Sequence, residues 1–175
     1  MYRKYLWSHP APQKKRKLDR IDMNILRTLQ FEGRISYTEL ADRVGLSTTP
    51  CMERVKRLEK DGYIEGYYAR VNPEALGYSM LVFVEIALSY QSPDAFDRFN
   101  KAVATLPYIL ECHLVSGDSD YLLKARISDM TEYRELLGEM LLTLPGVKNS
   151  KSYIVMEEVK ESLALPIDIS KPRSY

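Results

Sequence analysis

The segment RISYTELADRVGLSTTPCMERVKRLEKDG, residues 34–62, decides the fold of the N-terminal half of this chain. Ser36 is placed to cap a first helix, and Glu39 follows three residues later, as in a capping box. Gly45 can adopt the left-handed conformation that ends a helix. The spacing therefore predicts a short helix that stops at Gly45, where the chain turns.

A second helix is predicted directly after this turn. Ser47 or Thr49 can cap it, and Pro50 suits its first turn, where a missing N–H is harmless. Its apolar residues recur at helical spacing and form one stripe, made of Met52, Val55 and Leu58. Its other face is expected to carry Glu53, Arg54, Lys56, Arg57 and Lys60. Two helices joined by a glycine turn, the second with a basic outer face, are typical of a helix-turn-helix.

The second helix is the predicted DNA-binding element. Residues at the start of such a helix meet base edges or phosphates, and basic residues within two turns add phosphate contacts. The predicted contacts are Ser47, Thr48, Thr49, Arg54, Lys56 and Arg57. The segment Tyr63–Val71 is interpreted as a short β-hairpin, which would make the motif winged. The alternative is a helical hairpin with a solvated charged face.

A third helix is predicted over Leu18–Phe31, with Asp19 as its cap and Asp22 three residues later. Its apolar residues, which recur every three to four positions, are Leu18, Ile21, Ile25 and Leu29. Before it, residues 1–17 show no period and end in a basic run. They are interpreted as a disordered tail, with a basic arm that touches phosphates as the alternative.

The charge distribution divides the chain. Its net charge is +1, but residues 1–72 hold 15 Lys+Arg against 9 Asp+Glu, and residues 73–175 hold 10 against 15. A basic half beside an acidic half indicates a polyanion-binding domain next to a domain with another task. Two distant cysteines, Cys51 and Cys112, predict neither a disulfide framework nor a zinc site. No apolar run is long enough to span a membrane, so the expected location is the cytoplasm.

The second half follows an expected hinge at residues 73–78. Strands are predicted at 80–88, 109–115, 121–127 and 147–159, and helices at 93–106 and 130–144. The order strand, helix, strand, strand, helix, strand indicates an α+β, ferredoxin-like βαββαβ domain with both helices on one face. The other face is expected to be apolar and to bind a second copy, on the basis of Val82, Val84, Ile86, Ile154 and Met156.

From about Leu18 to Glu161 the chain resembles the Lrp/AsnC family of bacterial and archaeal transcriptional regulators. The matching segments include LDRID (18–22), ELADRVGLS (39–47), TPCMERVKRLE (49–59), LVFVEI (81–86), ECHLVSGDSDYLLK (111–124) and VMEEVK (155–160). The resemblance implies a winged helix-turn-helix domain (18–72), a β hinge, an effector-binding and oligomerisation domain of the RAM/ACT-like type (79–161) and a tail (162–175). It also implies homodimers that assemble into octamers or similar and wrap double-stranded DNA.

The resemblance further implies an amino-acid effector near the GDSD loop. By position, the residues implied are Leu114, Gly117, Asp118, Asp120, Met130, Leu142, Tyr153, Ile154 and Val155. A zwitterion needs a carboxylate for its ammonium, from Asp118 or Asp120, and backbone N–H groups for its carboxylate, from the turn at Gly117. The alternative is that Asp118 and Asp120 only stabilise the hairpin turn, because Asp and Gly are favoured in turns. Close relatives often carry proline at the position of Thr48 and an aromatic residue at that of Ser119, so the operator and effector preferences are expected to differ from those of these relatives.

The sequence thus predicts a DNA-binding transcriptional regulator that responds to leucine or another small amino acid. The alternative is a nucleoid-organising protein that wraps DNA with little sequence preference and no effector. An enzyme is not expected, because His113 has no nucleophile placed near it, and no glycine-rich phosphate loop or metal spacing occurs. No cofactor is expected.

Overall fold

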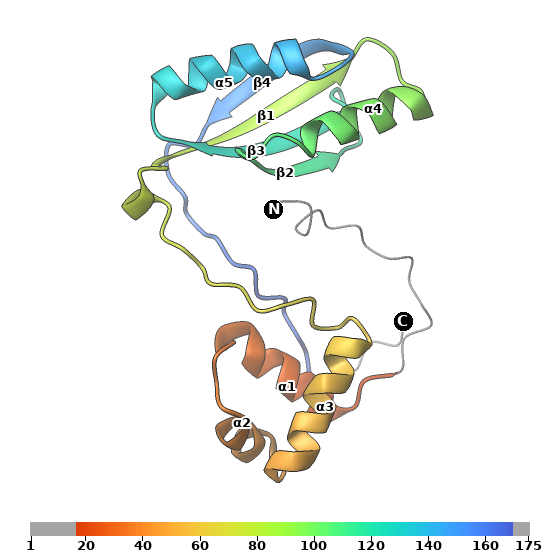
Figure 1. Ribbon diagram of the computed structural model, residues 1–175, viewed down its shortest axis with the longest axis vertical. Helices are drawn as coiled ribbons and strands as arrows, with labels where there is room; N and C mark the ends of the chain where they lie inside the picture. Colours follow the sequence, from red (N-terminus) through yellow and green to blue (C-terminus); the bar gives the residue numbers. More distant parts are fainter. Residues whose placement is uncertain (1–16, 170–175) are drawn as a thin grey trace. The chain divides into compact units, whose positions relative to one another are not determined.

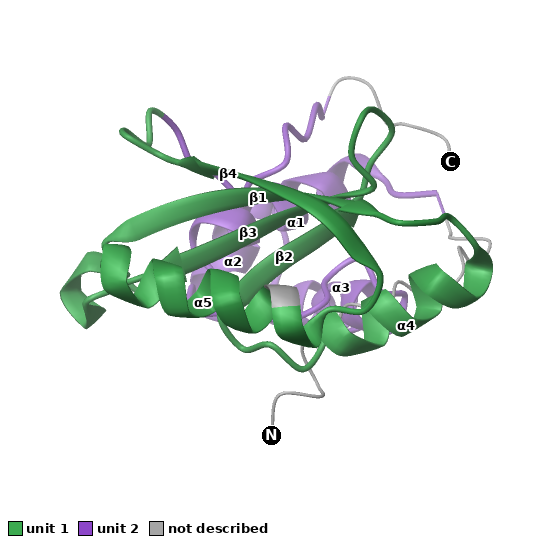
Figure 2. Cartoon of the chain, turned by 90° about the horizontal axis from the view of Figure 1, so that it is seen from above, with its two compact units in different colours: residues 1–7, 71–159 green, residues 8–70, 160–175 purple. Residues whose placement is uncertain are grey.

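The computed structural model describes residues 17–169, which form two compact units (Figures 1 and 2). The helical unit contains residues 17–70 together with residues 160–169. The sheet unit is Val71–Val159. The predicted N-terminal arm lies outside the described residues, except for Lys17.

The helical unit holds three helices, α1 (Arg20–Phe31), α2 (Tyr37–Val44) and α3 (Thr48–Lys60). Reciprocal capping boxes start α1 at Asp19 and α2 at Ser36, and Gly45 ends α2 with φ 72°. These three features confirm the predicted helix boundaries. They are local devices that satisfy the N–H groups left unpaired at helix starts.

The core of the helical unit lies between the three helices. Its buried residues are Ile25, Leu40, Ala41, Val44, Cys51, Val55 and Leu58. Cys51 is fully buried in this cluster, and it therefore packs as a small apolar residue. Val55 and Leu58 of the stripe predicted for α3 belong to this core, but Met52 does not, and Cys51 is the buried residue of the first turn instead.

The predicted wing hairpin is wrong. Residues 63–71 form no strand, and the sheet of the described chain contains only the four strands of the other unit. Tyr63 and Ile64 pack against the helical core, but Tyr67 and Tyr68 are 48% and 65% exposed, so no continuous buried apolar face runs along the segment. A two-stranded hairpin without such a face is marginally stable in water. Instead, the Tyr67 hydroxyl donates to Glu59 of α3 at 3.0 Å, and burial and this bond raise its pKa.

The start of the sheet unit contains the short turn expected as a hinge. Residues Glu74–Leu76 form one 3₁₀ turn, η2. The side chain of Asn72 accepts hydrogen bonds from the N–H groups of Glu74 and Ala75, and Gly77 ends the turn with φ 84°.

The sheet unit has the predicted ferredoxin-like order of elements. They are β1 (Met80–Leu88), α4 (Pro93–Val103), β2 (Ile109–Leu114), β3 (Tyr121–Ile127), α5 (Met130–Thr143) and β4 (Val147–Ile154). The strands are antiparallel in the order β2-β3-β1-β4, and both helices cover one face (Figure 1). The fourth strand ends at Ile154, five residues earlier than predicted.

Three of the residues expected on the open face of the sheet, the face turned away from α4 and α5, do not lie there. Val82, Val84 and Ile86 are at most 1% exposed and belong to the core cluster that includes Phe99 of α4 and Met140 of α5. The sequence of β1 does not show which of its residues point to the helices, because its apolar run has no alternation of apolar and polar residues. Ile154, which stands opposite Val82 in the strand pairing, and Met156 are exposed, at 43% and 99%.

The C-terminal segment returns to the helical unit. The side chain of Gln30 on α1 forms two hydrogen bonds with the backbone of Leu165, donating to its carbonyl at 3.2 Å and accepting from its N–H at 2.6 Å. Arg70 forms an ion pair with Glu161 at 2.6 Å. Part of the predicted tail is thus an ordered component of this unit.

Candidate DNA-binding surface and effector site

The N-terminus of α3 presents a cluster of exposed hydroxyl groups. Ser47 occupies the N-cap position, yet its side chain makes no capping hydrogen bond. Thr48 and Thr49 follow in the first turn, and all three residues are exposed. Hydroxyl groups at a helix N-terminus, where backbone N–H groups also point outward, suit contacts to phosphates and base edges.

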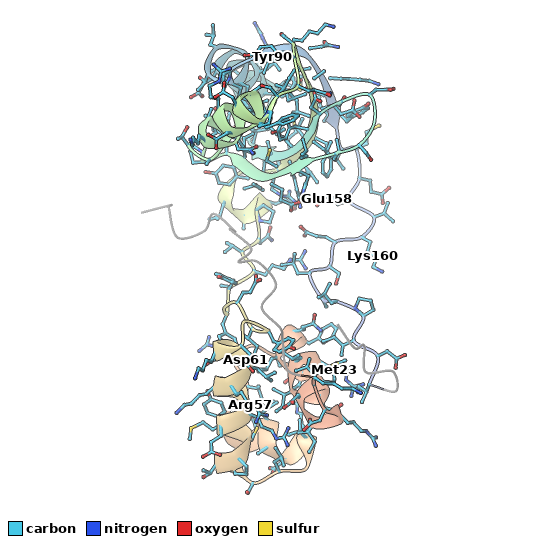
Figure 3. The ribbon with its side chains drawn as sticks, turned by 90° about the vertical axis from the view of Figure 1, so that its right-hand side faces the viewer. Met23, Arg57, Asp61, Tyr90, Glu158 and Lys160 are labelled. Atoms are coloured by element: carbon cyan, nitrogen blue, oxygen red, sulfur yellow. The ribbon has the colours of Figure 1, made fainter. Side chains whose placement is uncertain are left out.

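Arg54 and Arg57 do not lie on an outward face as predicted. Arg54 donates from Nη1 to Asp19 at 2.6 Å and to Asp22 at 2.8 Å, and Arg57 donates from Nη2 to Asp22 at 3.2 Å. Asp22 is fully buried on α1. Figure 3 labels Arg57 on α3. The two arginines therefore fix α3 against α1, and Lys56 is the exposed cation among the predicted contacts.

The ion pairs change the acid–base properties of this interface. The hydrogen bond to Asp19 raises the pKa of Arg54. Partial burial alone would raise the pKa of Asp19, but hydrogen bonds from the Asp22 N–H and from Arg54 bring it below its usual value. Both groups are therefore charged at neutral pH, which keeps the interface paired.

Asp120 has a structural role in the sheet unit. Its side chain is buried and accepts hydrogen bonds from the Leu88 N–H at 2.7 Å and from Gln91 Nε2 at 2.5 Å. Its backbone N–H donates to Ile86, and its carbonyl accepts from Val115. Asp120 thus joins the start of β3 to the end of β1, and its carboxylate is already occupied.

The rest of the GDSD loop is more accessible. Gly117 has φ +145°, a conformation that side chains rarely adopt. Asp118 is exposed, and Ser119 is half-buried with its hydroxyl donating to Glu85 at 3.4 Å. Of the two acids predicted to bind an ammonium, Asp118 is the one that remains open to solvent.

The other predicted effector residues do not converge within one chain. Met130 and Leu142, both exposed, lie near opposite ends of α5, about 18 Å apart at the rise of an α-helix. Leu114, Tyr153 and Ile154 are also exposed, and Val155 is half-buried. The structure does bring Tyr153 and the GDSD loop together, because Glu85 accepts hydrogen bonds from both Tyr153 and Ser119.

Glu85 and Gln91 were missed in the sequence. Both form hydrogen bonds with residues more than 25 positions away in the sequence. Glu85 also stands inside an apolar run, which by itself indicates only a buried strand. A single charge within such a run is the signal that marks it as a candidate, because an ionised side chain in a strand needs partners.

The remaining reactive residues give no support for catalysis. Burial raises the pKa of the Cys112 thiol to about 11, and burial also raises that of Cys51, so both thiols are protonated at neutral pH. His113 contacts Glu111 on the same strand at 3.1 Å. Within residues 17–169, no group of three or more His, Cys, Asp or Glu is arranged to hold a metal ion.

Comparison with known protein families identifies both units. Residues 18–65 match the winged helix-turn-helix DNA-binding domain, and residues 81–165 match the Lrp/AsnC ligand binding domain. The leucine-responsive regulatory proteins of Escherichia coli K12 and Klebsiella pneumoniae are both 62% identical to the chain over 150 residues, which are 86% of this chain and 92% of each relative. The chain belongs to the Lrp/AsnC family.

Solved structures of this family share the fold. A transcriptional regulator of Neisseria meningitidis, crystallised with L-methionine, is 34% identical, with a TM-score of 0.82 over 86% of this chain and 97% of that one. A feast or famine regulatory protein of M. tuberculosis, also complexed with L-methionine, is 33% identical, with a TM-score of 0.76 over 86% and 99%.

Lrp/AsnC membership establishes the class of function. The chain is a transcriptional regulator with a DNA-binding helix-turn-helix and a ligand-binding domain, and it is not an enzyme. None of the helices in residues 17–169 is long and apolar enough to cross a membrane.

Proposed function

We propose that this Lrp/AsnC regulator binds specific DNA sites and that a small apolar amino acid, such as leucine or methionine, changes its DNA binding or its assembly. The observation that carries the proposal is the 62% identity to leucine-responsive regulatory proteins over nearly their whole length. The L-methionine complexes of two structural relatives support an amino-acid effector.

The proposed DNA contacts divide into two groups. Ser47, Thr48 and Thr49 supply hydrogen bonds at the N-terminus of α3, and Lys56 supplies a phosphate contact. Arg54 and Arg57 set the position of α3 through Asp22, so their loss would weaken DNA binding by misplacing the other contacts.

The proposed effector site includes Asp118 and the exposed apolar residues Leu114, Met130, Leu142, Tyr153 and Ile154, with Gly117 and Val155. Because Met130 and Leu142 lie far apart on one helix, a site that uses both requires more than one chain. We therefore propose homodimers that assemble further, to an octamer or a similar size, in the cytoplasm and associated with the nucleoid. We propose no cofactor beyond the amino acid.

A gel-shift titration on the DNA upstream of this protein's own gene tests the proposal. Competitor DNA is present, and the salt concentration is fixed, because affinity for DNA depends steeply on salt. Specific binding that leucine, methionine or another amino acid shifts is the expected result. Loss of every shift on adding competitor would instead support a DNA-wrapping protein with little sequence preference.

A further inference from the structure

The side of α3 that points away from the core carries a stripe of exposed residues. The buried residues of the helix, which face the core of the helical unit, are Cys51, Val55 and Leu58. At about 100° per residue, four exposed residues fall together on the opposite side. We call them the outer stripe of α3, and they are Thr49, Glu53, Lys56 and Lys60. The second helix of a helix-turn-helix lies in the major groove, so the outer stripe is expected to face the bases.

Glu53, the acidic residue of the outer stripe, is unpaired. A glutamate commonly pairs with cations three or four positions later on its helix, which here are Lys56 and Arg57. Within residues 17–169, neither pairs with it, and its side chain forms no hydrogen bond. Arg57 instead donates to the buried Asp22 at 3.2 Å (Figure 3). Glu53 therefore presents a free carboxylate to solvent.

A free carboxylate that faces DNA suits a base edge and not the backbone. Phosphates are anions, and cations or neutral donors contact them. An ionised glutamate only accepts hydrogen bonds, so it needs a donor. In the major groove the donors are the amino groups of cytosine and adenine, and adenine also places its acceptor N7 beside that group. Cytosine is therefore the base that best suits Glu53.

The neighbours of Glu53 fix its position relative to DNA. Thr49, one turn earlier on the outer stripe, can donate to a phosphate or a base edge, and Lys56, one turn later, can contact a phosphate. The ion pairs of Arg54 and Arg57 hold α3 against α1. Glu53 thus lies on a fixed helix between residues that supply affinity, and it is free to supply selectivity.

We propose that Glu53 determines part of the DNA sequence preference by accepting a hydrogen bond from the N4 amino group of a cytosine in the major groove. Guanine or thymine at that position would place an acceptor against the carboxylate, which is unfavourable. Each α3 helix that enters a major groove would then select one cytosine through Glu53. This inference rests on the proposed sequence-specific binding of DNA.

Selection of bound duplexes from a random-sequence library tests the proposal. The full chain and its variants are used at one salt concentration, and the bound DNA is sequenced. The wild type is expected to select sites with a cytosine at one position for each α3 helix. Titrations of four duplexes that differ only in this base pair then measure the preference. Cytosine is expected to be favoured about tenfold, the size expected for one mismatched base pair.

Two substitutions change the acceptor in different ways. Glu53→Ala removes it and is expected to bind the four duplexes about equally. Glu53→Gln has an amide donor beside its oxygen, a pattern that matches N7 and N6 of adenine, so its preference is expected to move from cytosine to adenine. Asp42→Asn, at an exposed position of α2, removes the same charge elsewhere in the helical unit and is the matched control. It should keep the wild-type preference for cytosine.

The melting temperature separates a lost contact from lost folding. Because Glu53 is exposed and unpaired in the described chain, both Glu53 variants are expected to melt like the wild type. A clearly lower melting temperature would make Glu53 a support of the fold and would overturn the proposal.

The outcomes also separate the inference from the proposed function. If the wild type selects a motif and either Glu53 variant keeps its preference for cytosine, or loses the preference at all positions alike, the assignment of Glu53 is wrong. The proposed function then still stands. If the wild type selects no motif, sequence-specific binding fails, and the inference fails with it.

Discussion

Arg54 of α3 donates a hydrogen bond at 2.8 Å to Asp22, a fully buried carboxylate of α1. The basic side chain that suggests a DNA contact is therefore also a support of the helix-turn-helix. Removing one partner of a buried ion pair is costly, because the other charge remains buried and unpaired. The basic residues of α3 therefore fall into two groups. Arg54 and Arg57 hold α3 against α1, and Lys56 is exposed.

The Asp22→Ala change is expected to destabilise the helical unit by about 1.5–3 kcal/mol, the range for hydrogen bonds to charged groups, because Arg54 and Arg57 would lose their common partner while Arg54 keeps Asp19. Thermal unfolding followed by circular dichroism measures the effect. Lys56→Ala, a change at an exposed position of α3, is the control and should shift stability by less than about 0.5 kcal/mol. Equal melting temperatures for both variants would contradict a supporting role for Asp22.

The Lys56→Ala change is expected to weaken DNA binding nearly equally on different sequences. One lost phosphate contact should also reduce the slope of log K against log salt by about one. Titrations at several salt concentrations measure the slope. Lys148→Ala removes the same charge from the sheet unit and should leave the slope unchanged. An identical slope for the Lys56 variant and the wild type would show that Lys56 does not contact DNA.

Asp120 and Asp118 should respond differently to alanine substitution. Asp120→Ala leaves the buried Leu88 N–H without its partner, which is expected to cost about 1–3 kcal/mol of stability. Asp118→Ala, in the exposed part of the loop, should leave stability unchanged. Unfolding of both variants in urea makes the comparison, and a destabilisation confined to Asp118→Ala would reverse the assignment.

Acidification should weaken the junction between α1 and α3. The pKa of Asp19 is lower in the folded chain than its usual value, so its stabilising effect is complete above that usual value, near 4, and is lost as pH falls through the lower, folded value. The melting temperature of the wild type should therefore fall below about pH 4 more steeply than that of Asp19→Asn. Parallel pH profiles for the two proteins would show that Asp19 makes no such contribution.

The features predicted correctly from the sequence depend on neighbouring residues. The capping boxes at Asp19 and Ser36 and the left-handed Gly45 use partners within a few positions, and the order of strands and helices follows from local periodicity. A family resemblance carried by several ordered segments added the fold and the class of function.

The features predicted wrongly depend on distant partners. Asp118 and Asp120 are alike in the sequence, and only the hydrogen bond from Leu88, 32 residues away, makes Asp120 structural. The hairpin after α3 has suitable residues but no third strand to support it. The faces of β1 could not be assigned, because an uninterrupted apolar run carries no alternation.

The central claim is that the amino acid and the DNA site are energetically coupled in one protein. Linkage requires that, if the amino acid changes the affinity for the operator by some factor, the operator changes the affinity for the amino acid by the same factor. The measurement is the dissociation constant of the amino acid for the full chain, alone and saturated with operator DNA at one salt concentration. The account predicts a difference of at least about fivefold, in the same direction as the shift in operator affinity. Identical constants with and without DNA would contradict it.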